Sequence, residues 1–408
     1  ASTCSTLSAD RFGHTATYLP NSGRVLVVGG VRWVPVDGGV RLGFPRSIEM
    51  YDPIAGTFEV VAELRVGGAR AFHSATLLDE GRVLITGGQA EESGLQASLR
   101  TAFIIDATDP GRVTITSEGL VMNTARTGHR AVRLQDGRVV IIGGRTLTPG
   151  ASRARDHTYL SSLELFDPVN GVFLRLDDSQ SNAVEMDSPR FGHSATLLSE
   201  GSTIFIAGGT DGDGPVLSPE VLQARSDGTF AATLLNAASI GVGAVEHAAA
   251  FDPVFGAIVL SGGFSTIESA EPTIGLPSSP RPEVEMWRLD PETLDLQRLC
   301  TATLNAGRGQ HTMSILGERI VFTGGRDASG LPSAGAEWAT LAVGSGLTGC
   351  FATAPSVTAM ADARTYHSAT RVPQTGELLI VGGFAQAGSE SLPVSTTSGE
   401  TFSPTRAP

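Results

Sequence analysis

A histidine recurs along the chain at intervals of 54 to 64 residues, and in six of its seven copies an arginine stands three residues earlier. The histidines are His14, His73, His129, His193, His247, His311 and His367. The arginines are Arg11, Arg70, Arg126, Arg190, Arg308 and Arg364, and Ala244 takes the place of the seventh. Imidazole can bind a metal or move a proton near neutral pH, and guanidinium can hold an oxyanion. Since seven equivalent catalytic sites in one chain are implausible, we interpret both residues as structural parts of a repeat.

The other reactive side chains form no recognisable catalytic or metal-binding pattern. The three cysteines show no CxxC spacing and no zinc-type arrangement with histidine, and the serines show no GxSxG motif of a hydrolase. The run Asp211-Gly212-Asp213-Gly214 superficially resembles a calcium loop, but it lacks the further acidic ligands, so a polar turn is favoured. We therefore expect no catalytic residues, no metal and no cofactor.

Two segments combine arginine with aromatic residues and are the best candidates for ligand binding. Residues 31–47 read VRWVPVDGGVRLGFPRS, and residues 145–162 read RTLTPGASRARDHTYLSS. Guanidinium groups and aromatic faces suit a planar or anionic ligand, such as an acidic sugar or an acidic protein segment. The candidate residues are Arg32, Trp33, Arg41, Arg153, Arg155, His157 and Tyr159. The alternative is that each segment is a solvated insertion folded over the surface.

The residues between successive histidines predict four β-strands. An alternating stretch follows each histidine, as in HSATLL from His73, and a β-branched run such as RVLIT at 82–86 comes next. A glycine pair ends that run, and a third strand opens with a glutamate. The glycine pairs are Gly29-Gly30, Gly87-Gly88, Gly143-Gly144, Gly208-Gly209, Gly262-Gly263, Gly324-Gly325 and Gly382-Gly383. The glutamates are Glu49, Glu164, Glu220, Glu285, Glu337 and Glu400, and the second unit has LRTAFIID instead.

Seven such units, each of about 58 residues, follow one another along the chain. A unit of this kind cannot bury both faces alone. The units must therefore stack, which predicts an all-β, seven-bladed β-propeller of four-stranded antiparallel blades, as one domain over residues 1–408. The last unit leaves no room for a fourth strand after Phe402. We expect the N-terminal segment, Ala1 to about Leu7, to complete blade 7 and close the ring.

The repeated arginine and the repeated glutamate are expected to form buried, hydrogen-bonded pairs, because guanidinium and carboxylate match as a fork. The fifth unit lacks the arginine and the second lacks the glutamate. Both gaps predict local substitutes for the missing partner.

Individual function should lie where the seven copies differ. Strands alternate in direction, so the connections between the second and third strands, here called the b–c loops, share one face of the disc with the connections between blades. Counted from the second glycine to the glutamate, the b–c loops hold 18, about 12, 19, 10, 21, 11 and 16 residues. Blades 1, 3, 5 and 7 thus carry the long loops, and loops on a rigid scaffold commonly carry binding residues.

The double glycine after an apolar strand, the aromatic residue shortly after a glutamate, and their spacing resemble kelch repeats. The resemblance covers all seven units and extends to bacterial secreted kelch propellers and the galactose-oxidase-like catalytic domain. It implies a propeller but no single activity, since kelch propellers serve as enzymes, carbohydrate binders and protein adaptors. Galactose oxidase relatives need a copper site with a Tyr–Cys crosslink. No cysteine here neighbours a suitable tyrosine in sequence, so this chemistry is not expected.

Charge and apolar content exclude several partners. The net charge of −13 argues against nucleic acid or an anionic membrane, and all 29 basic residues are arginine. No apolar run reaches the ~18 residues of a membrane span. A secreted or periplasmic location fits the composition and the start of the chain best.

The cysteines leave alternatives open. Three cysteines cannot all pair within one chain. Cys300 is expected near the end of one fourth strand and Cys350 near the start of the next, on opposite faces. A direct bridge would then be strained, so buried thiols are an equal alternative. Cys4 could carry a lipid if the precursor were longer, although the residues before it make a poor lipid-attachment motif.

Together these patterns predict a non-enzymatic scaffold that binds a protein or a glycan through the face bearing the long b–c loops. One alternative is a carbohydrate-active enzyme with a site at the mouth of the central channel. Another is a structural subunit of a surface assembly.

Overall fold

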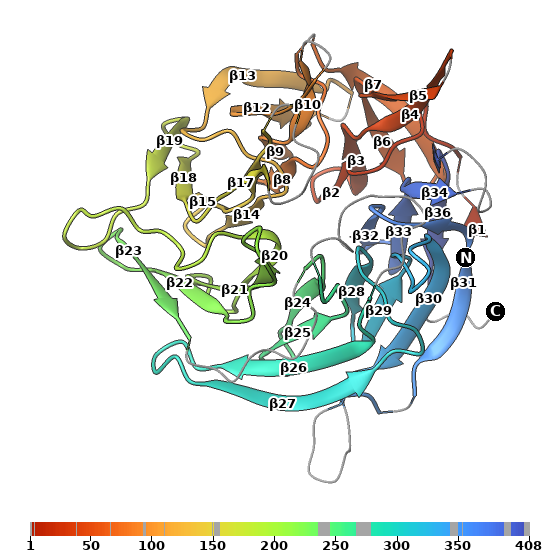
Figure 1. Cartoon of the computed structure of the whole chain (residues 1–408). Helices are drawn as coiled ribbons and strands as arrows, with labels where there is room; N and C mark the ends of the chain where they lie inside the picture. The colour runs from red at the N-terminus through yellow and green to blue at the C-terminus, as the bar shows by residue number, and fades with distance from the viewer. Residues whose placement is uncertain are drawn as a thin grey trace.

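The computed structural model describes residues 2–3, 5–37, 39–65, 67–92, 95–109, 111–148, 150, 156–235, 245–266, 279–342, 350–352, 354–386 and 393–403. Seven four-stranded antiparallel sheets stand as blades in a ring around a central axis (Figure 1). The prediction of an all-β, seven-bladed propeller is therefore confirmed. In these ranges no helix is long and apolar enough to cross a membrane.

Each blade runs outward from the hub through four strands. They are β2 (Thr15–Leu19), β3 (Arg24–Val28), β6 (Ser47–Asp52) and β7 (Thr57–Glu63) in blade 1; β8 (Ser74–Leu77), β9 (Arg82–Thr86), β12 (Thr101–Asp106) and β13 (Thr114–Val121) in blade 2; β14 (Arg130–Arg133), β15 (Val139–Ile142), β18 (Leu163–Asp167) and β19 (Val172–Arg175) in blade 3; β20 (Phe191–Leu197), β21 (Thr203–Thr210), β22 (Glu220–Ala224) and β23 (Phe230–Leu234) in blade 4; β24 (Ala248–Asp252), β25 (Ala257–Ser261), β26 (Glu283–Leu289) and β27 (Leu296–Thr303) in blade 5; β28 (Thr312–Leu316), β29 (Arg319–Thr323), β30 (Ser333–Thr340) and β31 (Ser356–Arg364) in blade 6; and β32 (Ser368–Val372), β33 (Glu377–Val381), β36 (Gly399–Phe402) and β1 (Ser2–Thr3) in blade 7.

The N-terminal segment closes the ring, as predicted. Strand β1 pairs with β36 in antiparallel register, with Ser2 opposite Thr401 and Thr3 opposite Glu400. Just beyond it, Leu7 is buried in an apolar cluster shared by blades 7 and 1. Blade 7 therefore joins the two ends of the chain (Figure 1), and the ring is held by backbone hydrogen bonds at its seam.

The core lies between the blades. The second strand of each blade is buried on both faces, which explains its unbroken β-branched run. Seven apolar clusters each combine residues from two neighbouring blades. Between blades 1 and 2, for example, Leu26 and Val28 pack with Ile85 and Ile105. No blade can bury its own two faces. Most of the buried apolar area therefore comes from the packing of neighbouring blades against one another, as the repeat predicts.

The glycine pairs join each blade to the next. Gly29 has a positive φ of 65°, and a Cβ atom there would lie 2.4 Å from the carbonyl oxygen of Arg70 in blade 2. The N–H of Gly30 donates to the same carbonyl at 2.8 Å. Equivalent bonds run from Gly88 to Arg126, Gly144 to Arg190, Gly263 to Arg308, Gly325 to Arg364 and Gly383 to Arg11. Glycine is required because a neighbouring backbone passes within hydrogen-bonding distance.

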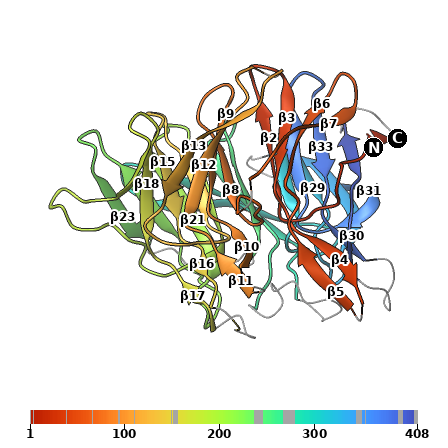
Figure 2. The same ribbon diagram turned by 90° about the horizontal axis from the view of Figure 1, so that it is seen from above.

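Within the described ranges, four b–c loops form two-stranded hairpins beyond the blades. They are β4 (Arg32–Val36) with β5 (Gly39–Gly43), β10 (Gln89–Glu92) with β11 (Leu95–Ser98), β16 (Arg145–Thr146) with β17 (Thr158–Tyr159), and β34 (Phe384–Gln386) with β35 (Pro393–Ser395). Figure 2 shows the first three hairpins on one side of the disc. Blade 2 carries a hairpin although its loop is short, and most of loop 5 lies outside the described residues.

The third strand differs from its predicted start. Glu49, Glu285 and Glu337 lie inside β6, β26 and β30 rather than at their first residue. The residues before each glutamate extend the strand because they pair with the fourth strand of the same blade, as Ser47 does with Glu63.

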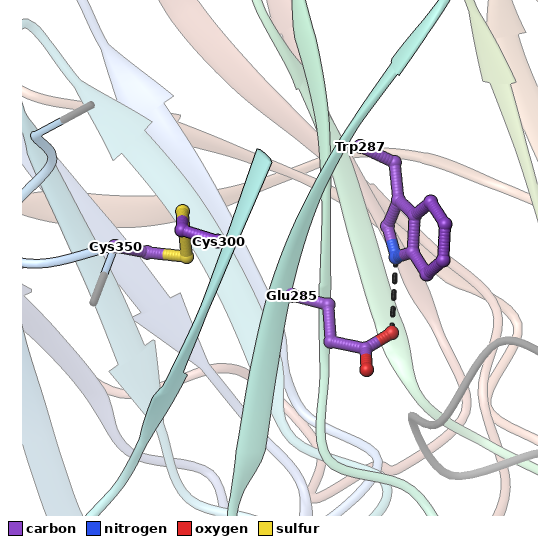
Figure 3. The surroundings of a disulfide bond; sticks show 4 residues. All are labelled: Glu285, Trp287, Cys300 and Cys350. Carbon is purple, nitrogen blue, oxygen red and sulfur yellow. Dashed lines mark hydrogen bonds between the residues drawn. A yellow bond between two sulfur atoms is a disulfide. The ribbon is translucent and has the colours of Figure 1, made fainter. Parts of the chain in front are cut away.

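A disulfide links blades 5 and 6, which corrects the prediction that Cys300 and Cys350 lie on opposite faces. Cys300 lies in the middle of β27, and Cys350 lies in the connection between β30 and β31 (Figure 3). That connection folds back on itself, with Leu341 paired to Phe351, and brings the two Cα atoms to 5.3 Å. The prediction was wrong because it placed Cys350 next to a strand rather than in a long connection. Cys4 lies outside the described residues.

Replacing both bridged cysteines with alanine should lower the free energy of unfolding by about 2–4 kcal/mol, because the bridge restricts the unfolded chain. The urea midpoint measures this loss. A reducing agent should lower the midpoint of the natural protein by a similar amount and leave the double variant unchanged. A midpoint that does not respond in either experiment would contradict the bridge.

Candidate functional site

The repeated arginine and glutamate meet in five blades. The pairs are Arg11 with Glu49, Arg126 with Glu164 (2.8 Å), Arg190 with Glu220 (2.6 Å), Arg308 with Glu337, and Arg364 with Glu400 (2.5 Å). None of these side chains is more than 3% exposed. Each carboxylate also accepts a backbone N–H from the segment that leads into its blade, as Glu164 does from Asn123 at 2.7 Å. These pairs connect the segments between blades to the third strands in the buried interior.

The two gaps in the pattern have substitutes. In blade 2, Phe103 stands where the glutamate would be, and the Arg70 guanidinium lies 4.7 Å from the centre of its ring. In blade 5, the Glu285 carboxylate accepts the indole N–H of Trp287 at 2.9 Å and lies 3.4 Å from the Arg298 guanidinium (Figure 3). Ala244 lies outside the described residues.

The seven histidines lie at the boundaries between neighbouring blades, here called the seams between blades. In most blades the Nε2 atom hydrogen-bonds a hydroxyl of the preceding blade, as His73 does with Thr15 at 2.9 Å. Burial lowers the pKa of the imidazoles of His14, His73, His129, His193, His311 and His367, helped by the nearby arginines, and brings His73 and His367 to about 3. The rings are neutral at pH 7, which suits hydrogen bonding to hydroxyl groups in the buried space between blades.

The residue just before each histidine, here called the hub position, has a left-handed backbone in all seven blades. The residues are Gly13, Phe72, Gly128, Gly192, Glu246, Gln310 and Tyr366, with φ between 52° and 68°. Five hydrogen bonds of 2.8–3.0 Å connect the backbone of one hub position to the next. Three blades use glycine, for which this conformation is free of strain, and four do not.

The four other hub side chains form a crescent around the axis. Phe72 and Tyr366 meet edge to face, 5.3 Å between ring centres, across Gly13. The Gln310 amide donates to the Tyr366 hydroxyl at 2.6 Å. Its carbonyl oxygen accepts from the Thr365 hydroxyl at 3.1 Å. With Glu246 in blade 5, the crescent (Glu246, Gln310, Tyr366 and Phe72) presents a carboxylate, an amide, a phenol and an aromatic face in ring order.

The crescent borders a cavity of about 310 Å³ on the hub axis, at the end of the channel that faces the b–c hairpins. On the side of blades 3 and 4, the wall of the cavity is formed by residues other than those of the crescent. There Gly128 leaves room for the Phe191 ring, and Arg145 stacks 4.1 Å from the centre of that ring. Arg130 also lines this wall. The repeat thus builds a symmetric hub, whereas the cavity within it is asymmetric.

Two of the predicted binding residues lie next to side chains that line the cavity. Tyr159 pairs with Arg145 across the β16–β17 hairpin and meets the Phe191 ring at 6.3 Å. Trp33 packs in an aromatic cluster with Phe12, Tyr366 and Phe384, and its buried indole N–H meets no hydrogen-bond partner in the part of the chain that the structure describes.

Three other predicted binding residues, Arg32, Arg41 and His157, lie on or beside the hairpins and do not line this cavity. Arg32 is half exposed and lies 3.3 Å from an Asp10 carboxylate oxygen. Arg41 is exposed on β5, and the His157 ring accepts the N–H of Thr148 at 3.2 Å. Arg153 and Arg155 lie outside the described residues.

The crescent was missed at the sequence level, although a signal for it exists. Aligning the seven copies on their histidines gives Gly, Phe, Gly, Gly, Glu, Gln and Tyr at the preceding position. A position that alternates between glycine and large polar or aromatic residues indicates a left-handed backbone that some blades use to carry a side chain.

Comparisons with known proteins support the fold. No protein-family model and no curated protein match the sequence. Among solved structures, the chain is similar to one titled "Structure of YjhT", with a TM-score of 0.57 and 14% identity over 86% of this chain and 99% of that chain. At this level of identity the likeness shows the fold alone.

Proposed function

We propose that this protein is a glycan-binding propeller that holds one sugar in the hub cavity. The observation that carries the proposal is the crescent. A side chain at a left-handed position costs about 1–2 kcal/mol relative to glycine, and three blades show that glycine serves the fold there. Four different side chains at that position therefore have a purpose other than folding, and all four line the same cavity.

The chemistry of the cavity favours a sugar. Sugar hydroxyls donate and accept hydrogen bonds, and the cavity offers the Glu246 carboxylate, the Gln310 amide and the Arg130 guanidinium. The faces of Phe72 and Phe191 suit the C–H surface of a pyranose ring. The volume is at the lower end of the range of about 300–1,000 Å³ typical of small-molecule sites.

The b–c hairpins would contact the remainder of the glycan or the protein that carries it. Three of them lie on one side of the disc (Figure 2), and the hairpins carry Trp33, Arg41 and Tyr159. Gln89 and Arg145 of two hairpins also line the cavity. The repeat pattern resembles that of kelch propellers, some of which bind carbohydrates. The Cys300–Cys350 disulfide supports an extracytoplasmic, oxidising location, because such bonds persist mainly there.

Replacing Gln310 with glycine should weaken glycan binding at least tenfold on a glycan array. The melting temperature should change little, because relief of the left-handed strain offsets the loss of the hydrogen bonds to Tyr366 and Thr365. Ser181→Gly is the matched control, because Ser181 also has a positive φ, of 63°, but lies outside the cavity. Undiminished binding by the Gln310 variant, or no bound glycan on the array, would refute the proposal.

A carbohydrate-active enzyme is the second candidate, and the presence of Glu246 and Tyr366 in one cavity favours it. A carboxylate and a phenol from different blades could transfer protons at a bound sugar. Incubating the protein with its bound glycan and following the sugar by NMR tests this. Conversion that Glu246→Gln abolishes while binding persists would establish catalysis.

A further inference from the structure

One blade breaks the repeat inside the channel. The residue after each histidine is small in six blades, namely Thr15, Ser74, Ser194, Ala248, Thr312 and Ser368, whereas blade 3 has Arg130. Several of these hydroxyls bond the histidine of the next blade. Thr15 pairs with His73 at 2.9 Å, Ser194 with His247 at 2.8 Å, and Ser368 with His14 at 2.9 Å.

The arginine removes a hydrogen bond from the hub. His193, the histidine that follows blade 3, is fully buried, and neither of its ring nitrogens has a hydrogen-bond partner among the described residues. Arg130 occupies the place of the missing hydroxyl and donates through Nε to the His193 carbonyl oxygen at 2.7 Å. A buried polar group without a partner is unfavourable, so the fold alone would favour threonine or serine here.

The Arg130 guanidinium lines the cavity without a carboxylate partner. The repeated arginines face glutamates or an aromatic ring, whereas no Asp or Glu of the described residues lies within ion-pair distance of Arg130. Arg145 brings a second guanidinium to the same wall, stacked on Phe191. Glu246 is the one carboxylate among the described lining residues, and it belongs to blade 5.

We infer that Arg130, with Arg145, binds an oxyanion, a carboxylate or a sulfate, carried by the sugar in the hub cavity. The inference rests on the proposed function and adds the chemical class of the sugar. A planar guanidinium suits the paired oxygens of such a group, and burial in the channel strengthens the attraction. Fixed by its Nε bond, Arg130 would bind the anion with little loss of side-chain freedom.

The test replaces Arg130 with threonine, the residue of blades 1 and 6. The variant restores a hydroxyl near His193, so its melting temperature should stay equal or rise. Binding is measured on an array in which each uronic-acid or sulfated glycan is printed beside its neutral counterpart. We expect the natural protein to bind a charged member at least tenfold more tightly than its neutral counterpart, and the variant to lose that preference. Arg133→Thr is the matched control, because Arg133 is exposed at the far end of the same strand, β14.

Two results would overturn the oxyanion site. One is a natural protein that prefers neutral glycans, and the other is an Arg130 variant that keeps the preference for charged ones. If no glycan binds, the proposed function fails, and the anion site is then judged with acetate and sulfate against chloride at equal ionic strength. Stabilisation of the natural protein beyond that of the Arg130 variant would support the site, and equal shifts in both would exclude it.

Discussion

Acidification from pH 7 to pH 5 should lower the free energy of unfolding by several kcal/mol. The cause is the set of buried histidines at the seams between blades, each neutral in the folded protein. Burial, with a smaller contribution from Arg70 or Arg364, lowers the pKa of His73 and of His367 from 6.5 to about 3. Their hydrogen bonds to hydroxyls of neighbouring blades hold the neutral rings in place.

The sign follows from proton binding in the two states. Between pH 6.5 and pH 3 the unfolded histidines take up protons and the folded ones do not. Stability is therefore complete above pH 6.5 and falls as the pH drops toward 3. At pH 5 each of these two residues should cost about 2 kcal/mol, because one pH unit corresponds to about 1.4 kcal/mol. The other buried histidines act in the same direction, so the total loss exceeds that of the two alone.

The dependence of melting temperature on pH measures this effect, because its slope gives the number of protons taken up on unfolding. Carboxylates do not interfere strongly above pH 5, since their ordinary pKa values lie near 4. His73→Gln should reduce the proton uptake by about one and flatten the slope. Stability that stays constant between pH 7 and pH 5 would show that the histidines are not held neutral.

The fold was predictable from the sequence because one pattern occurs seven times. Weak local signals, such as a glycine pair or a β-branched run, become decisive when they recur in register, and the missing last strand indicated how the ring closes. The physical reason is that each blade satisfies the same constraints, namely a strand buried on both faces and a backbone approach at Gly29 and its equivalents.

The candidate site was predicted less well, because it depends on single departures from the repeat. The sequence pattern favoured the long loops, where the copies differ in length. The crescent and Arg130 instead differ in residue type within the most regular part of the chain. The crescent is recognised from the left-handed backbone at the hub position, and Arg130 from the hydroxyl–histidine hydrogen bonds between blades. Both features are visible only in the three-dimensional structure.

Replacing Arg126 with methionine should destabilise the protein by about 3–5 kcal/mol, because the fully buried Glu164 carboxylate would lose its cation. Glu164 would retain the N–H groups of Asn123 at 2.7 Å and Thr124 at 3.0 Å. Those amide bonds satisfy its oxygens but do not neutralise its charge. Urea denaturation gives the loss as a shift of the midpoint.

Blade 2 provides the matched comparison, since Arg70 occupies the same place without a carboxylate. Burial lowers the pKa of Arg70 to about 10, which still leaves it charged at neutral pH. A methionine there can pack on Phe103, and the hydrogen bonds to Gly68, Gly87 and Thr101 are lost. We expect Arg70→Met to cost about 1–3 kcal/mol, less than Arg126→Met.

A second replacement separates the charge from the packing in blade 3. Adding Glu164→Gln to Arg126→Met removes the unpaired charge and keeps the shape of the side chain, so the double variant should be more stable than Arg126→Met alone. If the double variant is no more stable, or if Arg70→Met costs as much as Arg126→Met, the arginine contributes through its bonds to the glycine carbonyl rather than through the ion pair. Arg126 and Arg70 donate to Gly143 and Gly87 at 2.9 and 3.0 Å, so the comparison holds that contribution constant.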